Sequence, residues 1–297
     1  MALIGLLLDL QKFHQWQLHV WHGNHGWHEN SAIFASEIKQ WCIKKNLSFY
    51  MTEGVHKETK NESIAREWRY QNLKKTAEVI SKKNNKEPCL HILTGHTSSD
   101  RAETFILNLA RGTDLAGLGS MSSTRNLGQG SKLEKKKLIR PMLCFSREET
   151  RMICSDMNLP IWIDPSNQNT KLSRNKIRHT VIPILEELHP GCSIRIASLS
   201  ERIGHYKKDE NTLIELAMRI LKNDKGLCRK ELMNIPKTSR AKVLAYWLKE
   251  KGIPNISSTQ LEEISQVIGP TKKPGERYLA AGWIITWDKD SIHIKTK

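Results

Sequence analysis

Short apolar stretches alternate with helical segments through the first 190 residues, and this alternation restricts the fold more than any other feature. The stretches QLHVWH, LSFYMTEGV and CLHILTGH have the length and apolar content of strands. Each is followed by a segment whose apolar residues recur at helical spacing. Alternating strands and helices predict an α/β domain with a doubly wound, mostly parallel sheet. Ligands bind such sheets at the carboxyl ends of the strands.

The chain itself opens on a helix. In MALIGLLLDL the leucines at 3, 6, 7 and 10 recur at helical spacing, and QLHVWH is the first stretch that has the character of a strand. Nucleotide-binding proteins of this class usually place a phosphate loop between a first strand and a first helix. We therefore expect the first strand of the sheet to be missing from this chain.

The pattern changes after His189-Pro190-Gly191, where helical segments follow one another without strands. The chain ends in two β-rich segments around Asp288-Lys289-Asp290, which predict a hairpin. We expect a catalytic α/β domain over 1–189 and a smaller helical domain over 190–297 that ends in this hairpin. Residues 122–137 carry glycines and lysines without periodicity and predict a mobile basic loop.

Charge and cysteine content narrow the classes of function. The chain has 47 Lys and Arg against 31 Asp and Glu, a formal charge of +16, which favours RNA or DNA as a partner. Its 6 cysteines form no CxxC pair, which argues against a structural zinc or an iron-sulfur cluster. Free thiols indicate a reducing, cytoplasmic location. No apolar run approaches the roughly 20 residues that span a bilayer, so no membrane partner is expected.

The strongest local signal is TGHTSSDRAETFILNLARGTDLAGL, residues 94–118. Thr97 can cap a helix that has Asp100 at its third position and ends at Arg111-Gly112. Asp100 and Glu103 lie three residues apart and share its first turn. The two carboxylates could bind an amine or a magnesium ion, or they could complete a capping box and complement the helix dipole.

Two pairs of arginines and a group of histidines are further candidates. Arg66 and Arg69 share a helix in NESIAREWRY, and Arg66 follows Glu62 by one helical turn, so a solvated ion pair is one interpretation. Arg174 and Arg178 place two guanidiniums on one helix face, which favours an anionic partner because adjacent cations repel each other. The histidines of HVWHGNHGWHEN invite a zinc hypothesis, but their spacing matches no known site and no cysteine is near, so zinc is not expected.

Four motifs in order carry a resemblance to a known family: GHxxxDxAETxxxxLxRGxxxxGL, then LIRP at 138–141, DPSN at 164–167 and RNxxR at 174–178. Together they closely resemble the tRNA(Ile)-lysidine synthases of the N-type ATP pyrophosphatase, or PP-loop, superfamily. The resemblance runs from about Met1 to Leu188. Beyond it, the helical region and hairpin look like the substrate-binding domain of the family's short form.

The resemblance implies an ATP-dependent, AMP-forming ligase that joins lysine to the wobble cytidine of tRNA(Ile). The carbonyl oxygen of the base would attack the α-phosphate of ATP and release pyrophosphate, and the ε-amine of lysine would then displace AMP. ATP and Mg²⁺ would be needed, with tRNA(Ile) and free lysine as partners. No protein partner is implied, and a homodimer stays open.

The resemblance also assigns residues, by their match to the family's motifs. It implies catalytic roles for Asp100, Glu103 and Arg66, the last from an ARxxRY-like segment, with Asp100 as a candidate Mg²⁺ ligand. The implied binding residues form two groups: His22, His25, Gly95 and His96 for ATP, and Arg111, Arg174 and Arg178 for phosphate or tRNA.

Members of this family carry an SGGxDS phosphate loop immediately before residues that look like MALIGLLLDL. We expect one of two explanations. Either the natural start lies upstream of Met1, which the intact later motifs favour, or the protein has lost its first strand and its phosphate-binding loop. The chain as printed is expected to bind ATP weakly. One alternative is a catalytically inactive tRNA-binding protein. The other is a tRNA thiolase of the same superfamily, which ranks lower because thiolases that use a cluster or paired cysteines need a CxxC pair and this chain has none.

Overall fold

The computed structural model describes most of the chain, with the side chains of Glu62, Pro165 and Ser166 left aside. His28, Asp164 and residues 128–135 of the predicted basic loop lie outside the described residues. The described ranges are 1–26, 29–54, 62–83, 88–127, 136–163, 165–170, 172–224, 226–253, 256–269 and 273–296.

The chain divides into two compact units, Met1–Gly204 and His205–Lys297. The division falls within helix α9 (Cys192–Leu221) rather than at the 189/190 junction expected from composition. The first turns of α9 pack on the α/β unit: the Ser200 hydroxyl donates to the Leu118 carbonyl at 2.7 Å, and Glu201 pairs with Arg101 at 3.2 Å. The helix therefore begins as part of the first unit.

The first unit contains the predicted parallel strands, in two separate pieces. Strand β1 (His19–Asn24) pairs in parallel with β2 (Ser48–Glu53), and β3 (His91–Leu93) pairs in parallel with β5 (Lys136–Ile139). Strand β4 (Thr124–Leu127) adds an antiparallel edge to β5. Part of the predicted mobile loop is thus a strand, because its residues 124–127 complete the backbone hydrogen bonding of β5.

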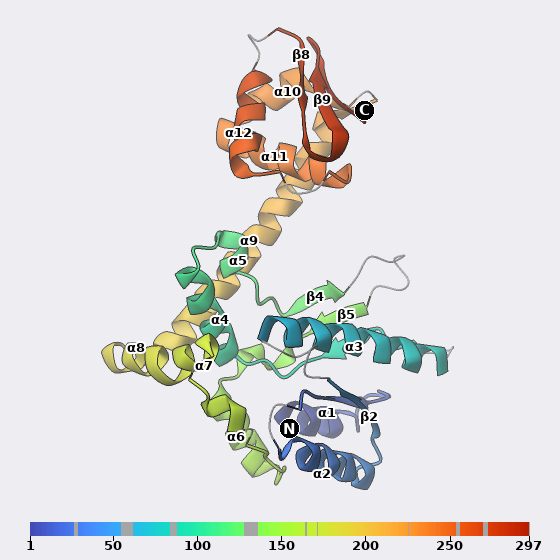
Figure 1. Cartoon of the computed structure of the whole chain (residues 1–297), viewed down its shortest axis with the longest axis vertical. Coiled ribbons are helices and arrows are strands. Elements are labelled where there is room, and N and C mark those ends of the chain that lie inside the picture. The colour runs from blue at the N-terminus through green and yellow to red at the C-terminus, as the bar shows by residue number, and fades with distance from the viewer. Residues whose placement is uncertain are drawn as a thin grey trace. The chain divides into compact units, whose positions relative to one another are not determined.

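Helix α3 (Glu62–Lys83) lies between the two pieces of sheet (Figure 1). On one side Trp68 meets Trp21 of β1 with ring centroids 6.2 Å apart. On the other side Ala77 packs with the buried side chains of Ile92 and Leu138. The helix therefore contributes to the core on both of its flanks, as the α/β pattern predicts.

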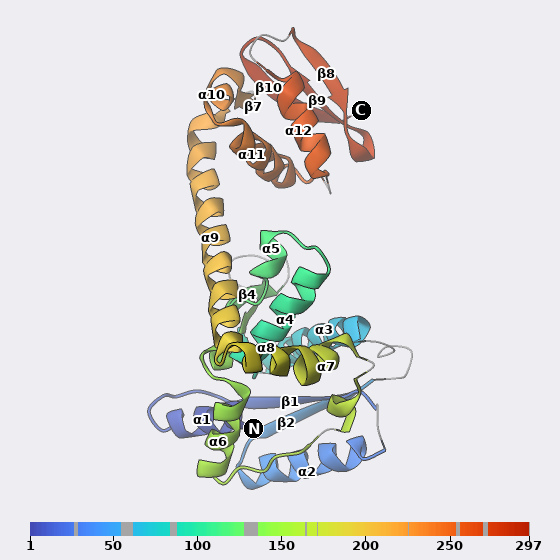
Figure 2. The ribbon, with the colours of Figure 1, turned by 90° about the vertical axis from the view of Figure 1, so that its left-hand side faces the viewer.

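The expected opening helix is present as α1 (Ala2–Leu10), and it lies beside α6 (Arg147–Asp156), as Figure 2 shows. Ala2 packs with Met142 and Cys154 in a small apolar cluster. The remaining helical elements of this unit are α2 (Ser31–Lys44), α4 (Ser98–Ala110), α5 (Leu115–Leu118), α7 (Ser173–Lys176), a π-helical turn (Ile177–Val181), α8 (Ile182–Leu188), and 3₁₀ turns at Pro141–Cys144 and Pro165–Gln168.

The second unit combines helices with a five-stranded antiparallel sheet of order β6-β7-β10-β9-β8. The predicted hairpin is β9 and β10, and most of β8 falls in the first of the two predicted β-rich segments. Strands β6 and β7 were not expected, because strands of 2 or 3 residues are too short to show a period of two. The elements are α10 (Arg229–Asn234), α11 (Lys237–Glu250), α12 (Ser258–Val267), β6 (Lys222–Asn223), β7 (Gly226–Cys228), β8 (Gly275–Tyr278), β9 (Trp283–Trp287) and β10 (Ser291–Thr296), with a 3₁₀ turn at Ala280–Gly282.

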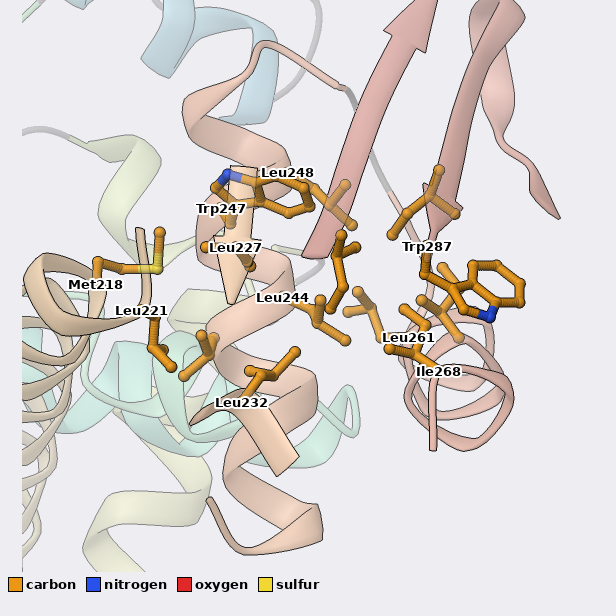
Figure 3. Packing of buried hydrophobic residues seen from close by; sticks show 14 of the residues in the cluster. Met218, Leu221, Leu227, Leu232, Leu244, Trp247, Leu248, Leu261, Ile268 and Trp287 are labelled. Carbon is orange, nitrogen blue, oxygen red and sulfur yellow. The ribbon is translucent and has the colours of Figure 1, made fainter. Parts of the chain in front are cut away.

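The core of the second unit lies between these helices and the sheet. Leu244, Trp247 and Leu248 of α11 belong to this core together with Leu227 of β7, and each of these side chains is at most 1% exposed (Figure 3). None of the helices in the described ranges is long and apolar enough to cross a membrane.

Replacing a core leucine tests this packing. Leu244→Ala removes a fully buried side chain and leaves a cavity, so the free energy of unfolding should fall by about 2–5 kcal/mol. Leu213→Ala, at a side chain 65% exposed, should change it by less than about 0.5 kcal/mol. Urea unfolding followed by circular dichroism measures both, and equal losses would contradict the described core.

Candidate active site

The first turn of α4 holds the two acids in fixed positions. Thr97 is the N-cap: its backbone N–H and its hydroxyl contact Asp100 Oδ2 at 2.8 and 2.9 Å, and the cap and Asp100 form the reciprocal bonds of a capping box. The capping prediction is therefore confirmed. Because Oδ2 is used by the cap, Oδ1 of Asp100 is the oxygen that meets the rest of the site.

Three arginines from separate segments converge on these acids. Glu103 Oε1 accepts from Arg147 Nη1 at 3.0 Å and from Arg178 Nε at 2.7 Å, and its Oε2 accepts from Arg174 Nε at 2.8 Å and Arg178 Nη2 at 3.0 Å. Asp100 Oδ1 accepts from Nη2 of Arg147 and of Arg174, both at 3.1 Å. We call these five residues the acid–arginine cluster.

Both acids of the cluster are ionised. Burial raises the pKa of Asp100, but the charge of Arg174 and the Thr97 backbone bond outweigh it and lower the pKa below its ordinary value. The pKa of Glu103 is likewise lowered, since hydrogen bonds from Arg178 and Arg174 outweigh the effect of burial. Three guanidiniums against two carboxylates leave the cluster with a net charge of +1.

Two of the three arginines in the cluster were predicted from the sequence, and the third was not. The spacing of Arg174 and Arg178 placed them together, and the structure brings both to the acids. Arg147 was not anticipated, because its position at the start of α6 signals only the capping box between Ser146 and Glu149. Nothing in the local sequence shows that this helix starts opposite α4.

Asp100 does not fit the role of a magnesium ligand in this arrangement. Both of its oxygens accept hydrogen bonds, and Arg147 and Arg174 surround its Oδ1 with positive charge. Mg²⁺ needs several free oxygen ligands in octahedral geometry. Among the described residues no group of three or more His, Cys, Asp or Glu side chains could hold a metal ion, so no step is assigned to one.

A cavity of about 580 Å³ lies at the carboxyl ends of β1 and β3. It adjoins the acid–arginine cluster, because α6 supplies both Arg147 and part of the wall, and because Asn167 of the wall is 3.4 Å from Arg178 Nη1. Its wall includes three residues predicted to bind ATP, namely His22, His25 and Gly95, together with Asn24, Phe34, Ile38, Arg69, Thr150, Arg151, Cys154, Ile161 and Trp162.

His96 lies beyond β3, near the cluster rather than in the cavity wall. Its Nδ1 is 2.8 Å from the Thr94 hydroxyl. Burial lowers its pKa to about 4; the charge of Asp100 opposes this shift, and Arg140, Arg174 and Arg66 add to it. The imidazole is therefore neutral at pH 7. Burial also lowers the pKa of His22.

The two remaining predicted residues, Arg66 and Arg111, lie in different parts of the first unit. Arg66 belongs to the electrostatic surroundings of His96, with its guanidinium 5.2 Å from the centre of the Tyr70 ring. Arg111 is exposed at the C-cap of α4, eleven positions after Asp100, which is about 16 Å along a helix. The structure does not bring Arg111 to the acids, because the motif places it at the opposite end of the same helix.

Comparison with known proteins agrees with this geometry. A family model described as a PP-loop domain matches residues 1–185, and one described as the TilS substrate binding domain matches residues 227–284. A tRNA(Ile)-lysidine synthase of Prochlorococcus marinus is 47% identical over 99% of this chain and 86% of that protein. The chain belongs to the tRNA(Ile)-lysidine synthase family.

Other relatives extend the comparison. The tRNA(Ile)-lysidine synthase of Parasynechococcus marenigrum is 39% identical over 99% of this chain and 85% of its own length. Among solved structures, the U34-tRNA thiolase NcsA of Methanococcus maripaludis matches with a TM-score of 0.50 and 18% identity, over 69% of this chain and 68% of that one. This second likeness shows the shared PP-loop fold alone.

The lowered pKa of His96 predicts a pH dependence of stability. The unfolded chain binds a proton at this residue below about pH 6.5 and the folded chain only below about pH 4. Stability should therefore decrease as the pH falls through this window, by about 3 kcal/mol from His96. His96→Asn should remove that part of the slope in urea titrations, whereas the exposed His189→Asn should retain it; identical slopes in all three proteins would contradict the burial of a neutral imidazole.

Proposed function

We propose that this chain attaches lysine to the wobble cytidine of tRNA(Ile), with ATP converted to AMP and pyrophosphate. The supporting observation is the acid–arginine cluster beside a cavity of about 580 Å³ at the carboxyl edge of a PP-loop sheet. A cavity of that size suits a nucleotide. Its mixed wall offers the apolar side chains of Phe34 and Trp162 to a base and the guanidiniums of Arg69 and Arg151 to phosphates.

The cluster suits both halves of this reaction. Negative charge that develops on the leaving pyrophosphate is stabilised by guanidiniums held in place before the reaction. An ammonium group of lysine needs a carboxylate, and each carboxylate oxygen of Glu103 already accepts two bonds. Phosphates that attract Arg174 or Arg178 would free those oxygens for lysine. Arg147 is the most exposed of the three at 30%, so we expect its bonds to the acids to be the easiest to break.

The two alternative functions are less well supported. The relatives named as lysidine synthases span nearly the whole chain, which does not support an inactive tRNA-binding protein. A thiolase of the kind that uses paired cysteines would need a CxxC pair, and the sequence has none. The likeness to the thiolase structure is one of fold only.

Replacing each acid tests the ligase assignment. Asp100→Asn and Glu103→Gln keep the size of the side chain and remove its charge, so lysine incorporation into a tRNA(Ile) transcript should fall by about a hundredfold or more. Glu148→Gln, an exposed acid on the first turn of α6, is the matched control and should stay within about twofold. Retained activity in both acid variants would overturn the assignment.

The salt dependence of tRNA binding tests how the net charge of +16 is used. If lysines and arginines neutralise several backbone phosphates, the logarithm of the association constant should decrease linearly with the logarithm of the salt concentration. Six or more such contacts would lower affinity by about a thousandfold between 50 and 200 mM salt. Filter binding with tRNA(Ile) measures the slope, and a flat response would exclude a phosphate-based interface.

A further inference from the structure

A second group of arginines surrounds Tyr70 on α3. The guanidinium of Arg66, one turn earlier on the same helix, is 5.2 Å from the centre of the Tyr70 ring. The guanidinium of Arg125 on β4 is 5.1 Å from the same centre. Arg140, directly after β5, contributes a side-chain hydrogen bond and its charge to the same tyrosine. We call these four residues the tyrosine–arginine cluster.

The positive charge of this cluster is not neutralised by the protein. Within the described part of the chain, no carboxylate lies within ion-pair distance of Arg66, Arg125 or Arg140. The three guanidiniums of the acid–arginine cluster, by contrast, share two acids. Burial raises the pKa of Tyr70, but the charges of Arg66, Arg140 and Arg125 and the Arg140 hydrogen bond outweigh it and lower the pKa below its ordinary value. The surroundings of Tyr70 thus favour negative charge.

The surroundings of Arg140 give the strongest indication that this cluster binds an anion. The residue is only 2% exposed, and its Nη1 donates to the Ser122 carbonyl at 2.6 Å. Its Nε is buried and has no hydrogen-bond partner among the described residues. A buried guanidinium without a counter-charge costs several kcal/mol, which an anion that contacts it would offset.

The cluster is separate from the nucleotide-sized cavity but close to the candidate active site. The cavity wall contains Arg69 of α3 but none of the four cluster residues. Arg66 and Arg140 both act on the pKa of His96, which also senses Asp100. Arg125 lies on β4, which pairs with β5, and Arg140 directly follows β5, so two of the cluster's arginines come from this edge of the sheet.

We propose that Tyr70, Arg66, Arg125 and Arg140 form a phosphate-binding site distinct from the cavity. Guanidiniums bind phosphate oxygens through paired, charge-assisted hydrogen bonds, and the tyrosine ring holds Arg66 and Arg125 apart as a platform. The ligand is a phosphate ester from one of two sources, the polyphosphate of ATP or the backbone of the tRNA substrate. The choice of sources rests on the proposed function, whereas the presence of the anion site does not.

Arg125 is the residue to replace, because it is exposed on the edge strand β4 and its loss leaves the core intact. Arg125→Gln should weaken binding of a phosphate probe by tenfold or more. The probes are pyrophosphate, followed by calorimetry, and an RNA hairpin with the anticodon-loop sequence of tRNA(Ile), followed by fluorescence anisotropy. A loss with pyrophosphate identifies ATP as the source, and a loss with RNA, with a salt slope reduced by about 1, identifies the backbone.

A matched control and a second variant complete the test. Lys75→Gln removes one charge from the opposite, exposed face of α3, nine residues after Arg66, and should change either affinity by less than twofold. Tyr70→Leu removes the platform and should reproduce the loss seen with Arg125→Gln. Unchanged affinities for both probes, or an equal loss in Lys75→Gln, would overturn the proposal.

The outcome is distinguishable from failure of the proposed function. If the wild-type chain incorporates no lysine into tRNA(Ile) but Arg125→Gln still weakens phosphate binding, only the ligase assignment fails. If lysine is incorporated and Arg125→Gln binds both probes normally, only the phosphate site fails.

Discussion

The buried carboxylate of Glu103 is the constraint on which the rest of the first unit depends. Removing such an ion from water costs several kcal/mol unless its lone pairs are filled by strong donors. Four bonds from Arg147, Arg174 and Arg178 fill them. Because those arginines come from α6, α7 and the π-helical turn, one acid on α4 fixes the positions of three other segments (Figure 2). Loss of any donor would leave part of that cost uncompensated.

The same arrangement gives the site its selectivity for charge. The acid–arginine cluster carries a net +1 and the tyrosine–arginine cluster +3, so anions are attracted to this edge without any rearrangement. A cation can reach the carboxylates only if a guanidinium leaves, so under the proposed function we expect the phosphate-bearing substrate to bind before the amine. The neutral imidazole of His96, whose pKa responds to groups of both clusters, adds no further positive charge.

Local signals predicted much of this unit and none of its long-range contacts. The Thr97 cap, the shared turn of Asp100 and Glu103, and the spacing of Arg174 and Arg178 are all short-range properties, and each was predictable. Arg147 meets the acids across 44 and 47 positions of sequence, which only the packing of α6 determines. Strand β4 and the short strands of the second unit exist because partners complete their hydrogen bonding, a condition that periodicity does not encode.

Helix α6 links the acid–arginine cluster to the wall of the cavity. Its first residue, Arg147, forms ion pairs with Asp100 and Glu103. Its next turns contribute Thr150, Arg151 and Cys154 to the wall of the cavity. The same short helix therefore positions an arginine of the acid–arginine cluster and borders the space that a ligand would occupy. If ligand binding in the cavity and the ion pairs of Arg147 are coupled through α6, the coupling is reciprocal: the factor by which breaking those ion pairs changes the affinity of the cavity for its ligand equals the factor by which the ligand changes the equilibrium for breaking them.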